Sequence, residues 1–116
     1  MKSAARCKYV PGPHTFQLTW GEEQIIDRVK VWSGIIGGTG SRIVDYEIQY
    51  WDGTSWQTAA SVVGNKQDGH LGQYNDLVFP AVTTNMLRMY ITKGSPRDSM
   101  ARLFEIEVWG KSTSNQ

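Results

Sequence analysis

The sequence has one cysteine, Cys7, and two histidines. A single cysteine excludes an internal disulfide and every metal site built from several thiolates. No apolar run approaches the roughly 20 residues of a membrane-spanning helix. Residues 1–10 also lack the hydrophobic centre of a secretory signal. We therefore expect a domain that folds on an apolar core alone, and any export signal would have belonged to a longer parent chain.

Charge of one sign is also missing, since the net charge is +1 at pH 7. The basic residues are scattered and form no stripe, so the sequence predicts no nucleic-acid partner. Gly38-Thr39-Gly40 lies between two expected strands, which excludes a dinucleotide fingerprint and a Walker loop. No serine lies in a nucleophile elbow, and no carboxylate is closely spaced with a histidine. The sequence therefore predicts a protein that is not an enzyme.

Glycine and alternating apolar residues are plentiful in this chain of 116 residues, which is long enough for one apolar core. In residues 45–51, Tyr46, Ile48 and Tyr50 alternate with polar residues, and Asp52–Ser55 then predicts a hairpin turn. The same pattern predicts seven strands, at residues 14–20, 25–32, 43–51, 56–63, 74–79, 86–92 and 101–109.

No segment has a sustained helical period, so the fold class is all-β, an antiparallel sandwich or barrel. Asp27 interrupts the alternation of residues 25–32, which indicates a late start or a β-bulge. Residues 1–13 contain Pro11-Gly12-Pro13 and are expected to be irregular, and residues 111–116 to form a frayed tail. We expect residues 1–116 to make a single β-sandwich domain.

Three long connections, at residues 33–42, 64–74 and 93–100, are expected to meet at one end of this sandwich. Antiparallel strands reverse at each connection, so successive connections alternate between the two ends. The short turns then fall at the other end, at residues 21–24, 52–55 and 80–85, and Trp51 and Trp56 beside them are interpreted as scaffold. Long loops on a rigid scaffold commonly carry recognition, so the long-loop end is the predicted binding site.

Several stretches resemble a known family: DRVKVW, DYEIQYWDGTSWQT, TTNMLRMYIT and ARLFEIEVWG. Together, over residues 14–110, they are similar to the discoidin or coagulation-factor C-type domain, and most of all to family 32 carbohydrate-binding modules. The resemblance implies a galactose-binding-like jelly roll without catalysis, and a glycan ligand of galactose type at the apical loops. It also implies attachment to a larger enzyme or adhesin, outside the cell or on its surface.

The candidate ligand residues are polar and aromatic side chains of the matching loops, namely Trp32, Arg42, Asn65, His70, Tyr74, Arg97 and Asp98. We hypothesise that Arg97, His70 and Asn65 hydrogen bond to sugar hydroxyls. Tyr74 or Trp32 would stack on the apolar face of a pyranose. Solvated loops of any domain carry such residues, so the inventory alone does not identify a sugar site.

In relatives the glutamate of the closing motif, Glu105 here, supplies a ligand to a structural calcium. Calcium needs six or more oxygen ligands, and residues 1–13 are too short for the whole N-terminal segment that completes the site. The resemblance thus makes Glu105 the position for a calcium, while the sequence predicts no required cofactor. The shortened start also predicts an open sheet edge, through which a homo-oligomer could form.

Two other functions stay open. Discoidin-type sandwiches also bind proteins and lipids with their apical loops, and here Ile35-Ile36, Leu71 and Met100 are the apolar tips. Only Lys66 and Arg97 lie near them as basic anchors, so a membrane partner is not expected. The other alternative is a structural protein that associates with itself through the open edge.

Overall fold

The computed structural model describes residues 2–11, 14–34, 42–67, 72–94 and 100–112. Six strands make up these ranges: β1 (Lys2–Pro11), β2 (His14–Ser33), β3 (Asp45–Trp51), β4 (Trp56–Val62), β5 (Asn75–Lys93) and β6 (Met100–Ser112). They pair antiparallel in the order β1-β6-β2-β5-β3-β4. The predicted all-β antiparallel fold is confirmed. Within the described ranges no helix has the length and apolarity needed to cross a membrane.

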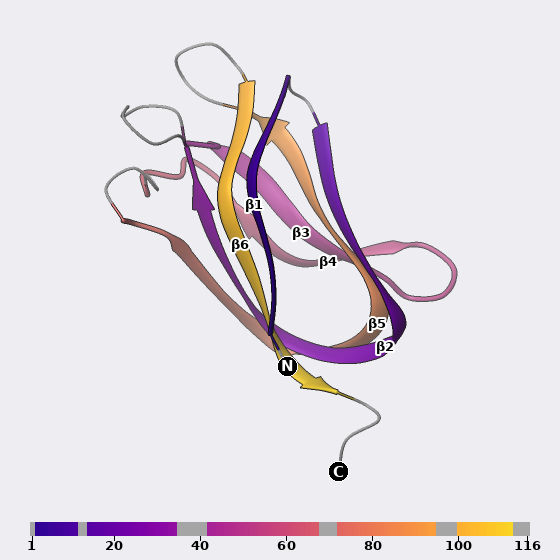
Figure 1. Ribbon diagram of the computed structural model, residues 1–116. Coiled ribbons are helices and arrows are strands. Elements are labelled where there is room, and N and C mark those ends of the chain that lie inside the picture. The colour runs from indigo at the N-terminus through magenta and orange to yellow at the C-terminus, as the bar shows by residue number, and fades with distance from the viewer. Residues whose placement is uncertain (1, 12–13, 35–41, 68–71, 95–99, 113–116) are drawn as a thin grey trace.

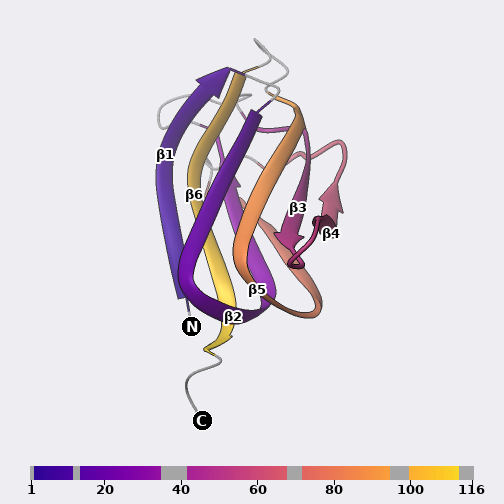
Figure 2. The ribbon, with the colours of Figure 1, turned by 90° about the vertical axis from the view of Figure 1, so that its right-hand side faces the viewer.

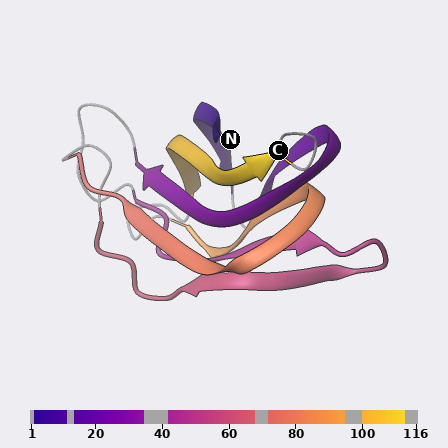
Figure 3. The same ribbon diagram turned by 90° about the horizontal axis from the view of Figure 1, so that it is seen from below.

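Two long strands, β2 and β5, bend side by side and pass from one layer of the sandwich to the other (Figures 1 and 3). The second half of β2 pairs with β6 and with the first half of β5, as in Val31↔Asn75, and β1 extends this first layer. The first half of β2 pairs with the second half of β5, as in Leu18↔Leu87, and β3 and β4 complete the second layer. A single continuous sheet thus folds over into a sandwich.

Because of these bends, four of the predicted strands are in fact the halves of two long strands, β2 and β5. Residues 21–24 and 80–85 do not separate short strands but lie inside β2 and β5, where the register shifts from Thr19↔Met86 to Gln24↔Thr84. Neighbouring strands that bend together keep their ladder, whereas a sequence pattern shows only where alternation stops. A second shift at Asp27 confirms the predicted irregularity, because Ile26 pairs with Val82 and Arg28 with Val78. Pro80, which has no N–H to donate, lies within this shift.

The expected irregular start differs from what is observed, and β6 includes the first two residues of the expected tail, whose last four lie outside the described residues. Residues 2–11 form β1, which lies along β6 from Lys2↔Trp109 to Pro11↔Met100 (Figure 2), and β6 extends to Ser112. A strand at a sheet edge makes hydrogen bonds on one side only, so it needs less apolar content than a central strand. The sheet therefore ends at β1 and β4, and self-association through an edge stays a prediction.

The core lies between the two layers and draws on both. Its buried side chains are Ile26, Val29, Val31, Ile43, Tyr46, Ile48, Phe79, Leu87, Met89, Ile91, Ile106 and Val108. Alternate residues of β3, of the second halves of β2 and β5, and of residues 105–109 in β6 point inward, as the sequence pattern predicts, and their neighbours form the outer faces. This alternation puts Lys30 and Trp32 on the outer face of the first layer, and Arg88 and Tyr90 on the outer face of the second.

Candidate functional site

The strand ends that carry the long connections lie together (Figure 1). The end of β2 pairs with the start of β6 at Ser33↔Leu103, and β3 begins opposite the end of β5 at Asp45↔Lys93. The end of β4 pairs there too, at Tyr46↔Val62. This agreement of registers confirms that the strand ends flanking residues 34–42, 63–74 and 94–99 share one end, which we call the loop end.

The β3–β4 turn belongs to the opposite end, as predicted. Thr84 in the bend of β5 donates its hydroxyl to the carbonyl of Trp51 at 2.6 Å. Within the turn, the Asp52 carboxylate accepts the backbone N–H groups of Thr54 and Ser55, at 2.7 and 2.8 Å. Hydrogen bonds from these two N–H groups, that of Ser55 first, lower the pKa of Asp52 below its ordinary value. Asp52 therefore stays ionised and holds the turn closed.

Asn65 organises the loop end from inside, with only 5% of its surface exposed. Its amide nitrogen donates to the Ile43 carbonyl at 2.7 Å, and its amide oxygen accepts the Gln67 N–H and the Asn75 amide at 2.8 and 2.9 Å. Its backbone carbonyl accepts Arg42 Nε at 2.6 Å. The hypothesised sugar contact by Asn65 is thus replaced in our account by a positioning role, because its amide is already paired within the protein.

The first long connection is closed at its base. Ile43 N–H donates to the buried hydroxyl oxygen of Ser33 at 3.0 Å, and Val44 N–H donates to the Lys93 carbonyl at 3.1 Å. Arg42, a predicted ligand residue, lies beside this closure and reaches across to the carbonyl of Asn65. These contacts fix the two ends of the connection against its neighbours.

A buried tyrosine extends the network towards the surface. Tyr46 donates its hydroxyl to Asn75 Oδ1 at 2.7 Å, and burial raises its pKa well above the ordinary value, so it remains a donor. Asn75 therefore has contacts to both Asn65 and Tyr46. Because Tyr74 directly precedes Asn75, the same contacts set the direction in which Tyr74 leaves β5.

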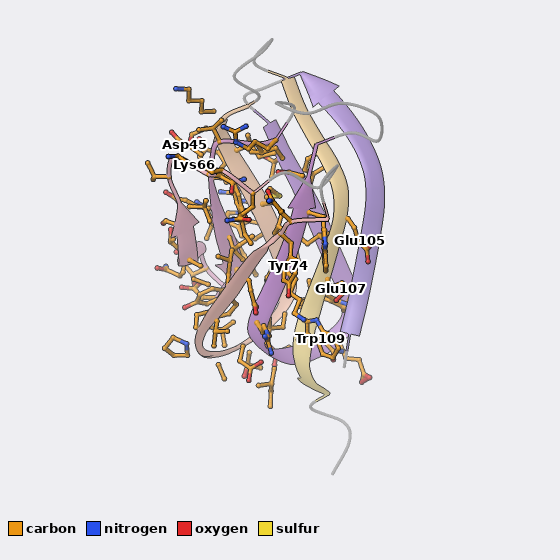
Figure 4. All side chains as sticks on the ribbon, turned by 90° about the vertical axis from the view of Figure 1, so that its left-hand side faces the viewer. Asp45, Lys66, Tyr74, Glu105, Glu107 and Trp109 are labelled. Atoms are coloured by element: carbon orange, nitrogen blue, oxygen red, sulfur yellow. The ribbon has the colours of Figure 1, made fainter. Side chains whose placement is uncertain are left out.

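Tyr74 and Trp32, the two predicted stacking residues, form one aromatic pair. Their ring centroids are 4.7 Å apart and their planes differ by 29°, while Tyr74 keeps 39% of its surface exposed. The ammonium of Lys30 lies 5.6 Å from the Tyr74 ring and 5.5 Å from that of Trp109. Tyr74, Glu105, Glu107 and Trp109 lie along this side of the first layer (Figure 4). The result is an exposed aromatic surface that starts at the loop end.

Lys30 and Trp109 also belong to this surface, although the sequence pattern did not predict either of them there. Lys30 lies two positions before Trp32 and so shares its face of β2, which was a usable signal. Trp109 reaches the surface only because β6 pairs with β2, at Arg28↔Trp109. The other predicted ligand residues, His70, Arg97 and Asp98, lie outside the described residues.

Among the described residues, the strand partners of Glu105 do not provide the oxygen ligands that a calcium ion requires. By register it lies opposite Trp32 in β2 and opposite Arg6 in β1, and neither residue supplies an oxygen ligand from its side chain. Among the residues that the structure describes, no group of three or more His, Cys, Asp or Glu residues could hold a metal. The described part of the chain does not fit a calcium site at Glu105, and we derive no role for calcium.

An ion pair borders the aromatic surface. Arg28 donates Nε and Nη2 to the two carboxylate oxygens of Asp76 at 2.8 and 2.6 Å. The hydrogen bonds from Arg28 lower the pKa of Asp76 below its ordinary value of 3.8. A lowered pKa in the folded state contributes stability that is present above the ordinary value and is lost as the pH falls through the folded value.

We expect the protein to lose stability on acidification below about pH 4, and Asp76→Asn to reduce that loss. The asparagine cannot bind a proton, so its contribution does not change across the acid range. Urea unfolding at about pH 6 and about pH 2.5 checks this by comparing the two proteins. Equal losses of stability in both would show that Asp76 does not contribute to the acid response.

We expect Asn65→Ala to lower the free energy of unfolding by about 2 kcal/mol, because it leaves the buried Ile43 carbonyl and Gln67 N–H without partners. Urea unfolding measures the loss, and near-ultraviolet circular dichroism reports the order of the Trp32–Tyr74 pair. Asn65→Asp is the second variant: it keeps the acceptor for Gln67 but sets a buried carboxylate against the Ile43 carbonyl, so it should destabilise the fold at least as much. A stability unchanged in Asn65→Ala would contradict the positioning role.

Fold and loop end together define the class of protein: an antiparallel β-sandwich in which the strand ends that flank the long connections lie at one apex. The chain belongs to the F5/8 type C domain family, whose sequence profile matches residues 3–106. This confirms the discoidin resemblance. The match starts ahead of residue 14, where the resemblance begins, so most of β1 is part of the family pattern.

Three solved structures illustrate the likeness. Chitosan-binding module 2 of a chitosanase/glucanase from Paenibacillus sp. IK-5, in complex with chitotriose, has a TM-score of 0.70 at 24% identity, over 94% of this chain and 77% of that one. CBM32-3 from a family 31 glycoside hydrolase of Clostridium perfringens has a TM-score of 0.70 at 15% identity, over 95% of this chain and 75% of that one. The CBM32 of AlyQ, in complex with 4,5-unsaturated mannuronic acid, has a TM-score of 0.66 at 16% identity, over 93% of this chain and 76% of that one.

At these identities the likeness shows the fold, and the neighbours themselves are carbohydrate-binding modules. None of the curated proteins is similar enough in sequence to match the chain.

Proposed function

We propose that this domain is a non-catalytic carbohydrate-binding module that recognises a glycan at its loop end. The observation that carries the proposal is the stacked Trp32–Tyr74 pair at the loop end, in which Tyr74 is 39% exposed. Flat aromatic faces attract the C–H face of a pyranose and need little conformational entropy to hold still. The neighbours that bind chitotriose and an unsaturated mannuronic acid support a glycan as the ligand.

The site is preorganised by the contacts beneath it. Asn65 joins Ile43 and Gln67 to Asn75, and Asn75 is the first residue of β5, directly after Tyr74. A ligand therefore binds without first ordering the Trp32–Tyr74 pair, which lowers the entropic cost of binding. His70, Arg97 and Asp98 remain our hypothesised hydrogen-bonding partners for the sugar, together with Arg42. The galactose-type sugar, the extracellular location and the attachment to a larger enzyme or adhesin remain predictions.

A glycan array tests the proposal, and it should carry galactosides, chitooligosaccharides and oligouronates side by side. We expect binding to at least one class, with a dissociation constant of roughly millimolar to tens of micromolar for a single site. Calorimetry on the best glycan then gives the affinity. Flotation with anionic liposomes is the competing arm, and association with vesicles but with no glycan would favour the membrane alternative.

A further inference from the structure

A second cluster of aromatic and charged side chains lies on the outer face of the second layer, away from the Trp32–Tyr74 pair. The guanidinium carbon of Arg88, on β5, lies 4.2 Å from the centroid of the Trp56 ring and 5.4 Å from that of Tyr90. Tyr90 is 41% exposed. Glu47 and Gln49 of β3 pair with Tyr90 and Arg88 in the ladder and so share their face. We call Glu47, Gln49, Trp56, Arg88 and Tyr90 the Arg88 platform.

Hydrogen bonds hold the platform in one geometry. Arg88 Nε donates to Gln49 Oε1 at 2.6 Å, and Gln49 Nε2 donates to Glu47 Oε1 at 2.8 Å. Thr58 donates its hydroxyl to the same Glu47 oxygen at 2.9 Å. These two bonds, that of Gln49 first, lower the pKa of Glu47, so its carboxylate stays ionised. Side chains from β3, β4 and β5 are thus locked together before any ligand arrives.

The platform has hydrogen-bonding capacity left over. Among the described residues, no side chain or carbonyl accepts from the terminal nitrogens of Arg88, and no donor reaches Oε2 of Glu47. A guanidinium offers five N–H donors in a planar fork, and a carboxylate offers only acceptors. Donors and acceptors therefore lie close together beside the exposed ring of Tyr90.

We propose that the Arg88 platform is a second glycan-binding surface, and that it takes uncharged pyranosides. A sugar hydroxyl both donates and accepts, so neighbouring hydroxyls of one pyranose can accept from Arg88 and donate to Glu47. The C–H face of the same ring then packs on Tyr90. An acidic sugar fits less well, because its carboxylate would meet the ionised carboxylate of Glu47. The surface differs from the loop end in residues and in layer, so it does not depend on the function proposed above.

Two sites on opposite layers would make the domain bivalent. A bivalent module binds a polysaccharide more tightly than a short oligosaccharide, since the second contact forms at a high effective concentration. The platform also gives Trp56 a function, in place of the scaffold role expected from its position beside the β3–β4 turn.

Nuclear magnetic resonance titration tests the platform directly, because each tryptophan indole N–H and the Arg88 Nε–H give separate signals. The uncharged probes are cellotetraose and β-1,4-galactotetraose, and trigalacturonate is the charged probe. The double variant Trp32→Ala/Tyr74→Ala isolates the platform from the loop end. We expect the Trp56 and Arg88 signals of this variant to move with at least one uncharged probe.

Two platform variants complete the test. Glu47→Gln removes the charge but keeps the shape, and Arg88→Lys keeps the charge but loses the fork, so each should weaken binding about tenfold. Thermal unfolding verifies that both variants are folded. If Arg88→Lys does not fold, the result for Glu47→Gln alone decides the test. The proposal would be overturned if neither uncharged probe shifts the Trp56 and Arg88 signals, or if trigalacturonate alone shifts them. An affinity that is unchanged in Glu47→Gln would overturn it as well. Movement at the platform without any at Trp32 in the unsubstituted protein would instead refute the loop-end site and leave the platform standing.

Discussion

Replacing both Trp32 and Tyr74 by alanine is expected to weaken glycan binding at the loop end by about 30-fold, which corresponds to roughly 2 kcal/mol. The two rings stack on each other at 4.7 Å, so each one orients the other as well as any ligand. Either single substitution removes one aromatic face and loosens the remaining ring. We therefore expect the two single effects to be non-additive, as for any pair in direct contact.

Tyr74→Phe is the matched control for this prediction, since it keeps the ring and removes only the hydroxyl. Calorimetry with the best glycan from the array measures the original protein and all four variants, and circular dichroism confirms that each is folded. The phenylalanine variant should bind within a few-fold of the original protein if stacking is the main contribution. An alanine double variant that binds as tightly as the original would place the sugar somewhere else on the domain.

The second large effect concerns Gly110, near the end of β6. A Cβ at this position would lie 1.7 Å from the carbonyl oxygen of Ile25 and 2.8 Å from the Cα of Ile26. Both are backbone atoms of β2, and Ile26 is fully buried in the core and pairs with Gly110 in the ladder. Relief of the clash therefore requires β2 and β6 to separate, so Gly110→Ala should cost about 3 kcal/mol or more.

Gly21→Ala is its control, because a Cβ there meets nothing within 4 Å. Thermal unfolding compares the two variants, and for a domain of this size about 3 kcal/mol corresponds to a fall in midpoint of roughly 10 °C. The Gly21 variant should stay close to the original protein. Equal midpoints for both variants would show that β2 and β6 tolerate more separation than their ladder indicates.

Alternation along single strands was enough to predict the all-β class, the inward face of each strand and the irregularity at Asp27. It failed where structure depends on a neighbouring strand. β1 was missed because an edge strand with small and basic residues carries no clear apolar face, and only its pairing with β6 defines it. β2 and β5 were divided because alternation stops at their bends, although the ladder between them continues.

The candidate site shows the same division between local and distant information. Trp32 and Tyr74 were both predicted as stacking residues, but as alternatives, because nothing local shows that 4.7 Å separates their rings. Asn65 was predicted to contact the ligand because an asparagine in a polar loop is expected to be exposed. Its burial follows from partners at Ile43 and Asn75, which lie far from it in sequence and could not be paired with it from sequence alone.

A crystal structure of the domain with its best glycan from the array tests the central claim most directly. We expect a pyranose ring packed at about 4 Å on the exposed face of Tyr74 or Trp32. We further expect the hydrogen bonds of Asn65 to be unchanged, because the site is preorganised. A glycan bound away from the Trp32–Tyr74 pair, with both rings in solvent, would contradict the account.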